Sequence, residues 1–355
     1  MIRVEVIDEL MYRGLEDGVY PGAAISIGDK SGELFRKVYG HRQILPEKKP
    51  MEKDTLFDIA SLTKITSTTM VALKLIEERK LSLNNTLGSF FETPKDKGNI
   101  SIFHLMTHLS GLAAHDQIYN LVKGPDDVVS HILDMDLLNT PGKAVVYSCL
   151  GYILLGKICE AAGNNTLDKL AKQCVFDPLG LKSAGYNPTQ GNNSGYTFAV
   201  TEFDNKTGTW LEGVVHDENA RFLGGVSGNA GVFANIEDMA GFALMFSGKG
   251  RTKSGSIISE SLFEEALKNH SPHCEEGRGL GFAVKAAMPV SCGSIFPVGS
   301  YGHTGFTGTS LWVDAETSQY VVFMTNRVHP TRENEKHIPF RREIHDLCAK
   351  EYRKL

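Results

Sequence analysis

Hydrophobic and polar positions change their period along the chain, and each period predicts a different kind of element. Within residues 3–16 the apolar positions recur at helical spacing, which predicts an amphipathic helix. Two short apolar runs follow, 22–28 and 33–40, and the residues that join them, 29–32, form a typical turn sequence. These two runs predict a β-hairpin.

The period becomes helical from residue 61 to about 175, with 62–80 as the best example. The polar segment 186–220 is rich in Gly, Asn and Thr and has no clear period, so we expect a long ordered loop or a small subdomain there. Another helix is predicted from Asn235 to about Phe246, where a Gly-Lys-Gly stop signal follows.

Alternation returns in the last 80 residues. Strands are predicted at Leu280–Lys285, Thr309–Asp314 and Gln319–Thr325, the last two as a hairpin. Pro339 opens a predicted C-terminal helix that runs through Tyr352. We therefore expect an α+β fold, in which residues 1–60 and 278–355 form one antiparallel sheet flanked by helices and residues 61–277 form an inserted, mostly helical domain.

Composition and charge exclude several classes of protein. The 355 residues include 41% hydrophobic and 22% charged residues, which is ordinary for a globular chain and excludes a fibrous or disordered one. A formal net charge of −5 gives no electrostatic footprint for nucleic acid or for an anionic membrane. The six cysteines form no C-x-x-C pair, so we expect reduced thiols and neither a disulfide scaffold nor a zinc site.

The N-terminal segment mixes charges into its apolar positions, unlike a secretory signal. The most apolar stretch, 144–156, is too short to span a bilayer. The expected location is therefore the cytoplasm, without membrane contact, and the sequence leaves the oligomeric state open.

Three short motifs could carry chemistry. The first is Ser61-Leu62-Thr63-Lys64, directly before an apolar helix. Residues three apart on a helix share a face, so Lys64 can reach the Ser61 hydroxyl, and the positive end of the helix dipole favours an anion there. The alternative is a capping serine with a surface lysine.

The second motif is Tyr147-Ser148-Cys149, at the start of an apolar helix. A tyrosine held against a lysine ionises more readily and could act as a general base, although a tyrosine at such a position often only packs. The third is His303-Thr304-Gly305, ahead of a predicted strand. An edge strand beside a nucleophile can supply an oxyanion-hole N–H, and the alternative is a glycine-rich bend without function.

In this order the three motifs resemble the serine β-lactamase and penicillin-binding-protein superfamily, in particular its class C β-lactamase-like branch. That branch includes D-alanyl-D-alanine carboxypeptidases, esterases and muropeptide amidases. The resemblance extends over nearly the whole chain, since 20–24, 56–60, 104–112 and 303–314 are also similar to segments of the family. It implies a β-lactamase/transpeptidase-like fold with the active site in the cleft between the sheet and the helical domain.

The resemblance also implies roles for individual residues. Ser61 would be the acylated nucleophile, Lys64 would help to deprotonate it, and Tyr147 would share the base role and protonate the leaving group. His303 would line the far wall of the site, and the backbone N–H groups of Ser61 and Phe306 would form the oxyanion hole. Substrate contacts would come from Cys149, Thr304 and Gly305. No cofactor and no metal are implied.

Two positions depart from the family pattern. Cys149 stands where the family usually has Asn or Asp, and a thiol is a weak hydrogen-bond donor. His303 replaces the lysine of many β-lactamases and is largely neutral at pH 7, so it holds an anionic group less firmly. Both departures disfavour efficient β-lactam hydrolysis and favour another ester or amide.

A fourth segment, 215–231, resembles a signature of the subgroup linked to muropeptide amidase and peptidase activity. Its His216 and Asp217 could shape a pocket for an amide-bearing substrate, or they could simply satisfy backbone groups in a buried loop. Rival motifs are missing: the sequence has no G-x-S-x-G, no P-loop and no dinucleotide fingerprint. His104 and His108 lie one turn apart, but no H-E-x-x-H completes a metal site.

We expect a serine hydrolase that acts on a small acyl substrate, a peptidoglycan-derived peptide or amide, through a Ser61 acyl-enzyme. One alternative is a carboxylesterase for small acyl esters with weak or no β-lactamase activity. Another is a catalytically silent ligand sensor with the same fold, for which Cys149 is the main support.

Overall fold

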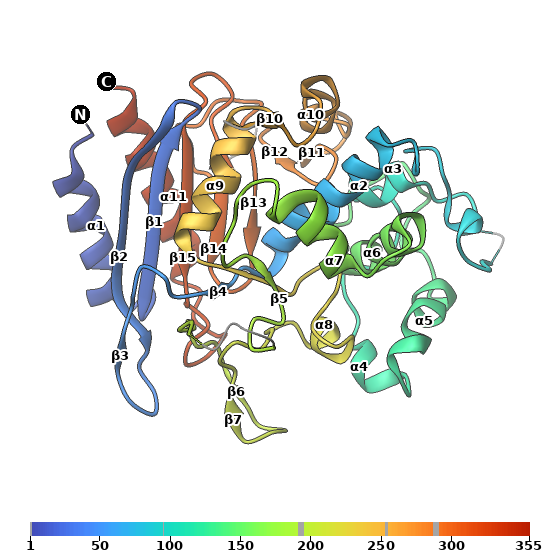
Figure 1. Cartoon of the computed structure of the whole chain (residues 1–355), viewed down its shortest axis with the longest axis horizontal. Helices are drawn as coiled ribbons and strands as arrows, with labels where there is room; N and C mark the ends of the chain where they lie inside the picture. The colour runs from blue at the N-terminus through green and yellow to red at the C-terminus, as the bar shows by residue number, and fades with distance from the viewer. Residues whose placement is uncertain (1, 95, 191–194, 253–254, 287–290) are drawn as a thin grey trace.

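An eight-stranded antiparallel sheet is the largest element of the computed structural model (Figure 1), which describes residues 2–94, 96–190, 195–252, 255–286 and 291–355. Its strand order is β11-β12-β13-β14-β15-β1-β2-β3. The strands are β1 (Gly22–Asp29), β2 (Gly32–Gln43), β3 (Lys49–Pro50), β11 (Gly277–Arg278), β12 (Ala283–Val284), β13 (Tyr301–Gly305), β14 (Thr309–Val313) and β15 (Tyr320–Thr325). In the centre β1 pairs with β15, so both ends of the chain build one sheet and the predicted α+β architecture is confirmed.

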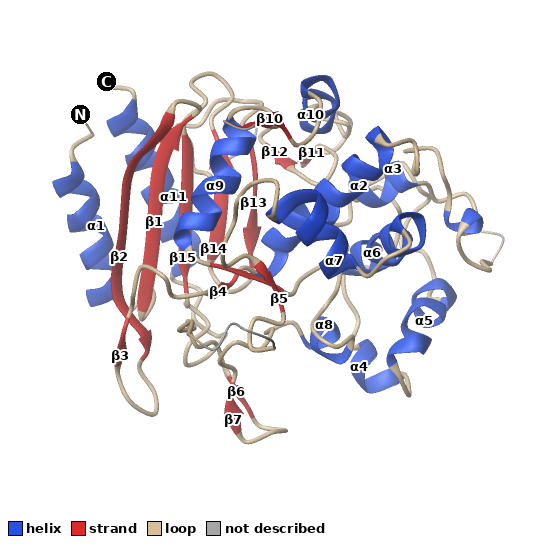
Figure 2. Ribbon diagram, viewed as in Figure 1, coloured by secondary structure: helices blue, strands red, loops and turns tan. Residues whose placement is uncertain are grey.

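Helices cover both faces of this sheet (Figure 2). On β1, Ala23, Ile25 and Ile27 share a core with α1 (Val4–Glu16) and α11 (His337–Tyr352), while Ala24 belongs to the core on the other face. Helix α9 (Ile236–Ser247) packs against β1 and β15 on that second face. A strand with both faces buried reads as a nearly continuous apolar run, as β1 does.

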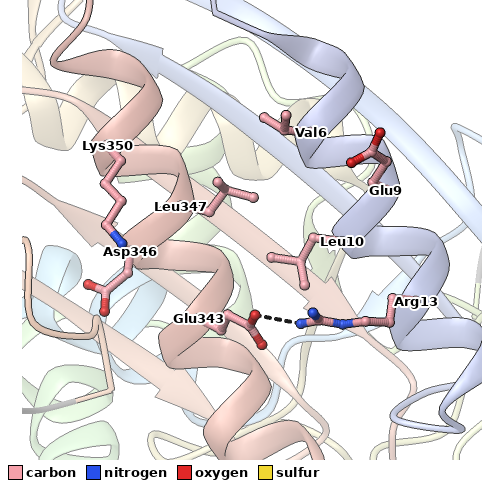
Figure 3. A pocket seen from close by; sticks show the side chains of 8 residues that line it. All are labelled: Val6, Glu9, Leu10, Arg13, Glu343, Asp346, Leu347 and Lys350. Atoms are coloured by element: carbon pink, nitrogen blue, oxygen red, sulfur yellow. Dashed lines mark ion pairs between the residues drawn. The ribbon is translucent and has the colours of Figure 1, made fainter.

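A groove runs between α1 and α11 (Figure 3), and the ion pair between Arg13 and Glu343 crosses it. Its lining residues are Val6, Glu9, Leu10, Arg13, Glu343, Asp346, Leu347 and Lys350. The groove lies on the α1/α11 side of the molecule and includes no residue of the three motifs.

The rest of the chain is mainly helical. It contains α2 (Thr69–Glu77), α3 (Ile102–Met106), α4 (Ile118–Leu121), α5 (Val128–Asp134), α6 (Cys149–Gly163), α7 (Leu167–Ala171), α8 (Glu218–Phe222) and α10 (Glu260–Leu267). Short strands complete it. One small sheet consists of β4 (Phe57–Asp58), β8 (Val232–Ala234) and β5 (Gly185–Tyr186), and two antiparallel pairs consist of β6 (Phe203–Asp204) with β7 (Thr209–Trp210) and of β9 (Arg251–Thr252) with β10 (Gly255–Ser256). None of the helices in the described part of the chain has the length and apolar character of a membrane span.

Two predicted elements differ from the observed ones. The helix predicted over 62–80 consists of a short turn at Ala60–Leu62, a π-helical turn at Lys64–Thr68 and α2, which ends at Glu77 because Arg79 is left-handed with φ +59°. The strand predicted over 280–285 is reduced to β12, because Gly281 has φ +86° and breaks the extended backbone. The hairpins, α1, α9 and the C-terminal helix are confirmed.

The predicted loop or subdomain 186–220 contains the β6–β7 hairpin and the start of α8, and its residues 191–194 lie outside the described residues. Helix α9 lies between residues 61 and 277, the segment predicted as the helical domain, yet it packs on the sheet because most of its side chains are apolar and buried. The division into two domains remains a prediction.

Candidate active site

Ser61 lies in a tight turn whose backbone is held in an unusual conformation. Ala60, the residue before it, has φ +48°, a region that a residue with a Cβ rarely adopts. The buried Asp58 carboxylate stabilises this turn, because Oδ1 accepts the Ala60 N–H at 2.8 Å and Oδ2 accepts the His216 N–H at 2.7 Å. The π-helical turn that begins at Lys64 follows directly, and such turns are frequent at functional sites.

Lys64 contacts the Ser61 hydroxyl. Its Nζ donates to Ser61 Oγ at 2.9 Å, to the main-chain oxygen of Asn229 at 3.0 Å and to Cys149 Sγ at 3.5 Å. The side chain is completely buried, and an ammonium has three N–H groups, so each of them has an acceptor.

Tyr147 completes this cluster. The Lys64 Nζ lies 5.0 Å from the centre of its ring, and the phenol interacts with both Lys64 and Ser61. Burial opposes a charge on Lys64, but the neighbouring Cys149, Tyr147 and Asp217 outweigh it and raise the pKa of Lys64 above its usual value. Burial raises the pKa of Tyr147, and the Lys64 charge partly offsets this rise. The ammonium lowers the cost of the phenolate, but the net rise keeps Tyr147 a neutral phenol, so the expectation that it ionises more readily than usual is wrong.

Three further cationic or imidazole side chains surround the Tyr147 ring. The rings of His108 and His303 have their centres 4.7 and 5.6 Å from it, and the Arg278 guanidinium lies 5.4 Å from it. The Nε2 atom of each histidine and Nε of Arg278 are buried and have no partner among the described residues.

His303 is a neutral imidazole. Burial, with the charges of Lys64 and Arg278, lowers the pKa of His303 to about 3. Its Nδ1 lies 2.8 Å from the Thr304 carbonyl oxygen, so Nδ1 carries the proton and donates it, and Nε2 is left as an acceptor.

The end of β13 lies directly against the Ser61 turn. Thr307 Oγ1 donates to the Asp58 carbonyl at 2.7 Å, and Thr309 Oγ1 donates to the Ile59 carbonyl at 3.0 Å. Only glycine fits at 305, since a Cβ there would lie 2.4 Å from the Ile59 oxygen. The backbone N–H groups of Ser61 and Phe306 form no hydrogen bond within the described residues, as groups that await an external acceptor would.

Sequence reasoning missed Arg327, which holds the Phe306 peptide in place. Its Nε and Nη2 donate to the Phe306 carbonyl at 2.9 and 2.7 Å, and its guanidinium lies 4.6 Å from the centre of the Phe306 ring. Asp58 and Asn229 were also missed. Asn229 belongs to the fourth segment, but its contact with Lys64 uses a main-chain oxygen, and no side-chain pattern signals such a contact.

The fourth segment contacts the Ser61 turn through the His216 N–H, which donates to the Asp58 carboxylate. His216 lies 2.8 Å from the Glu202 carboxylate and stacks on the half-exposed Phe306 ring, with the ring centres 5.5 Å apart. Asp217 caps α8 through the Ala220 N–H at 2.8 Å. Both side chains therefore have structural partners, and their contact with substrate remains a prediction, as do the substrate contacts of Cys149, Thr304 and Gly305.

No three His, Cys, Asp or Glu side chains in the described ranges are grouped so that they could hold a metal ion. The groups gathered around Ser61 can instead support covalent acyl chemistry: a hydroxyl, a lysine in contact with it, a phenol beside both, and unpaired N–H donors.

The chain is similar in sequence and in fold to known proteins. The family described as Beta-lactamase matches residues 7–346. The chain belongs to the beta-lactamase family. Its membership confirms the predicted fold and the predicted class of enzyme, a serine hydrolase.

Relatives within the family carry names from cell-wall chemistry. The chain is 28% identical to the N-acetylmuramyl-L-alanine amidase of Bacillus subtilis (strain 168) over 361 residues, which cover 92% of this chain and 81% of the amidase. It is 29% identical over 367 residues to a provisionally named D-alanyl-D-alanine carboxypeptidase of Escherichia coli (strain K12), with 92% and 83% covered.

Solved structures show the same fold. EstCE1, described as a hydrolase with promiscuous acyltransferase activity, superposes with a TM-score of 0.78 at 20% identity, covering 98% of both chains. The octameric penicillin-binding protein homologue from Pyrococcus abyssi has a TM-score of 0.73 at 21% identity, covering 92% of this chain and 74% of that one.

Proposed function

We propose that this member of the beta-lactamase family hydrolyses an amide bond of peptidoglycan-derived peptides through an acyl-enzyme on Ser61. The observation that carries the proposal is the contact of 2.9 Å between Lys64 Nζ and Ser61 Oγ, in a buried cluster that also contains Tyr147. The substrate class is supported by the relatives named as an amidase and a carboxypeptidase.

In the acylation step Ser61 Oγ attacks the carbonyl carbon of the substrate. Tyr147 accepts the Ser61 proton as a phenolate, a minor form because burial raises its pKa, and the Lys64 ammonium stabilises that form. The N–H groups of Ser61 and Phe306 donate to the oxyanion of the tetrahedral intermediate. When the C–N bond breaks, the Tyr147 proton passes to the leaving nitrogen, and the acyl group remains esterified to Ser61.

In the deacylation step a water molecule attacks the ester carbonyl. Tyr147 accepts a proton from this water and returns it to Ser61 Oγ as the ester bond breaks. The products are a carboxylate and the free serine, so each turnover consumes one water and changes no oxidation state.

Ester hydrolysis is the second candidate. At the position where the family usually carries an amide or carboxylate side chain, Cys149 offers a thiol that already accepts from Lys64. A thiol forms only weak hydrogen bonds with the amide group of a substrate, and an ester has no N–H group that needs such a hydrogen bond.

The first experiment is intact-mass spectrometry after incubation with a fluorophosphonate and, separately, with a penicillin. One fluorophosphonate adduct per chain is expected in the wild type and none in Ser61→Ala. The control is Ser67→Ala, which removes a nearby hydroxyl that is hydrogen-bonded to the Tyr186 hydroxyl and which should keep the adduct. No adduct in any protein would contradict the acyl-enzyme and favour a silent binder. The penicillin arm tests how well the pocket accepts a β-lactam, for which we expect slow or no labelling because His303 is neutral.

The second experiment identifies the bond that is cleaved. Muropeptides and a short-chain chromogenic ester are offered to the protein and to Ser61→Ala, and the products are identified by mass. Release of an amine or amino acid from the muropeptide supports the amidase or peptidase, and turnover of the ester alone supports the carboxylesterase.

A further inference from the structure

Arg341, in the second turn of α11, is a buried cation to which the described residues give no counter-ion. Its side chain is 9% exposed, and it forms neither a hydrogen bond nor an ion pair with any described residue. Its Nε is fully buried and has no partner among the described residues, whereas the residue as a whole keeps a small exposed surface. An anion could therefore reach the guanidinium from outside.

Two more nitrogen-bearing side chains lie beside Arg341. His337 is one turn earlier on the same face of α11. Its Nδ1 is buried and has no hydrogen-bond partner in the described part of the chain, although the imidazole also interacts with the Asn334 main chain. Arg327 follows the end of β15, and its charge acts on both residues. Burial and, next to it, the Arg327 charge lower the pKa of Arg341 to about 10 and the pKa of His337 to about 3. Arg341 therefore remains a cation at neutral pH beside a second cation.

The carboxylates of this region are already engaged or lie in solvent. Glu202 contacts Arg332 and His216, and the exposed Glu335 acts on Arg327. Arg327 itself is satisfied by main-chain oxygens of Phe306, Arg332 and Asn334. No described carboxylate makes an ion pair with Arg341.

A buried charge without a partner is strongly unfavourable, so native proteins pair it or bind an ion there. We propose that Arg341 and His337, beside Arg327, form a binding site for a small oxyanion behind the β13–β14 turn. A guanidinium fork matches the two oxygens of a carboxylate or a phosphate, which a halide cannot reproduce. The site borders the Ser61 cluster, since the charge of Arg341 acts on His303 and Arg327 holds the Phe306 peptide, but the inference does not depend on the proposed function.

Thermal unfolding of the full chain tests this site. Phosphate, acetate and chloride are compared at equal ionic strength, with Arg341→Met as the variant and Lys350→Met as the matched control, since Lys350 is an exposed cation on the same helix. We expect a saturating rise in Tm of about 2–3 °C in phosphate over chloride for the wild type and the control, and none for Arg341→Met. The acetate arm decides whether a carboxylate suffices or a phosphate is required.

The salt-free baseline is a second readout. If Arg341 is unpaired in the absence of an oxyanion, Arg341→Met should be at least as stable as the wild type, because it removes an uncompensated charge. Equal responses of the wild type and Arg341→Met, or no response of the wild type, would overturn the site. If the methionine variant fails to fold, phosphate binding to the wild type and to Arg341→Lys is measured by titration calorimetry instead. Binding to the lysine variant that is at least about fivefold weaker supports recognition by the guanidinium fork. Absence of binding to the wild type overturns the proposed site.

Discussion

Arg327 holds the Phe306 peptide through its carbonyl and also lies over the Phe306 ring, so its effect should appear in turnover rather than in binding. Lysine cannot reproduce the two hydrogen bonds to the Phe306 oxygen. For Arg327→Lys we expect kcat to fall by about 10²-fold with KM changed less than about threefold, because a misoriented oxyanion donor acts on the transition state. Arg342→Lys is the control for the loss of a guanidinium.

The same variant needs a check of folding. An unchanged melting temperature would show that the variant is folded and that only the Phe306 peptide is displaced. A raised KM with unchanged kcat would indicate instead that Arg327 contributes to substrate binding.

The neutral His303 predicts a specific pH dependence. Because burial and the nearby cations lower its pKa to about 3, it should not titrate in the range where histidine normally does. The profile of kcat/KM between pH 5 and 9 should therefore keep the same apparent pKa values in His303→Gln as in the wild type, although its height changes. An acidic limb near pH 6.5 that disappears in His303→Gln would show that the imidazole titrates in the working enzyme.

The candidate site was predictable from sequence where side chains carry the chemistry. The spacing of Ser61 and Lys64 on one helical face predicts their contact, and the family resemblance adds Tyr147 and His303. The supporting residues could not be found in this way. Arg327 and Asp58 act on main-chain groups of distant residues, and a contact with a main-chain oxygen or N–H leaves no pattern in the sequence.

At the scale of elements, the contact between β13 and the Ser61 turn depends on one residue without a side chain. A Cβ on Gly305 would lie 2.1 Å from Thr309 Oγ1 and 2.4 Å from the Ile59 oxygen. In Gly305→Ala the strand must move away from Ser61, so we expect labelling by the fluorophosphonate to slow by at least about 10²-fold and stability to fall by about 1–3 kcal/mol. The control is Gly185→Ala on β5, where a Cβ would meet nothing within 4 Å.

The elements themselves were predictable to different degrees. Strands β14 and β15 are short runs rich in β-branched and aromatic residues and buried at every position, and they were found with nearly their observed bounds. The strand predicted over 280–285 failed because one left-handed glycine ends the extended backbone, and apolar periodicity does not report φ. The π-helical turn after Ser61 was missed because it changes the hydrogen-bond pattern while the apolar face continues.

The whole molecule contains several buried histidines that lack a charge, and they make it sensitive to acid. Burial lowers the pKa of His303, His337 and His345 to about 3 and that of His108 well below its usual value. Between pH 6.5 and 3 the unfolded chain binds these protons and the folded chain does not, so stability should decrease as the pH falls through this window.

Urea unfolding at intervals of pH measures this loss. Each such histidine lowers the free energy of unfolding by up to about 1.4 kcal/mol per pH unit within the window. His345→Gln should therefore reduce the slope of the free energy of unfolding against pH by up to that amount. His115→Gln is the control, since that side chain is exposed. A slope that His345→Gln does not change would indicate that His345 is protonated without unfolding.

The pairing of β1 with β15 also has a consequence for how the chain is made. Gly22 bonds to the side chain of Asn326, 304 positions later, and the two ends of the chain lie on the same side of the molecule (Figure 1). On the ribosome the N-terminal hairpin therefore emerges long before its neighbour exists, and its β1 edge stays open while the helices between are synthesised. Open edges favour mispairing between chains, and contacts so distant along the sequence fold slowly. Yield in a cell should then depend on chaperones that shield this edge, as well as on the stability of the finished protein.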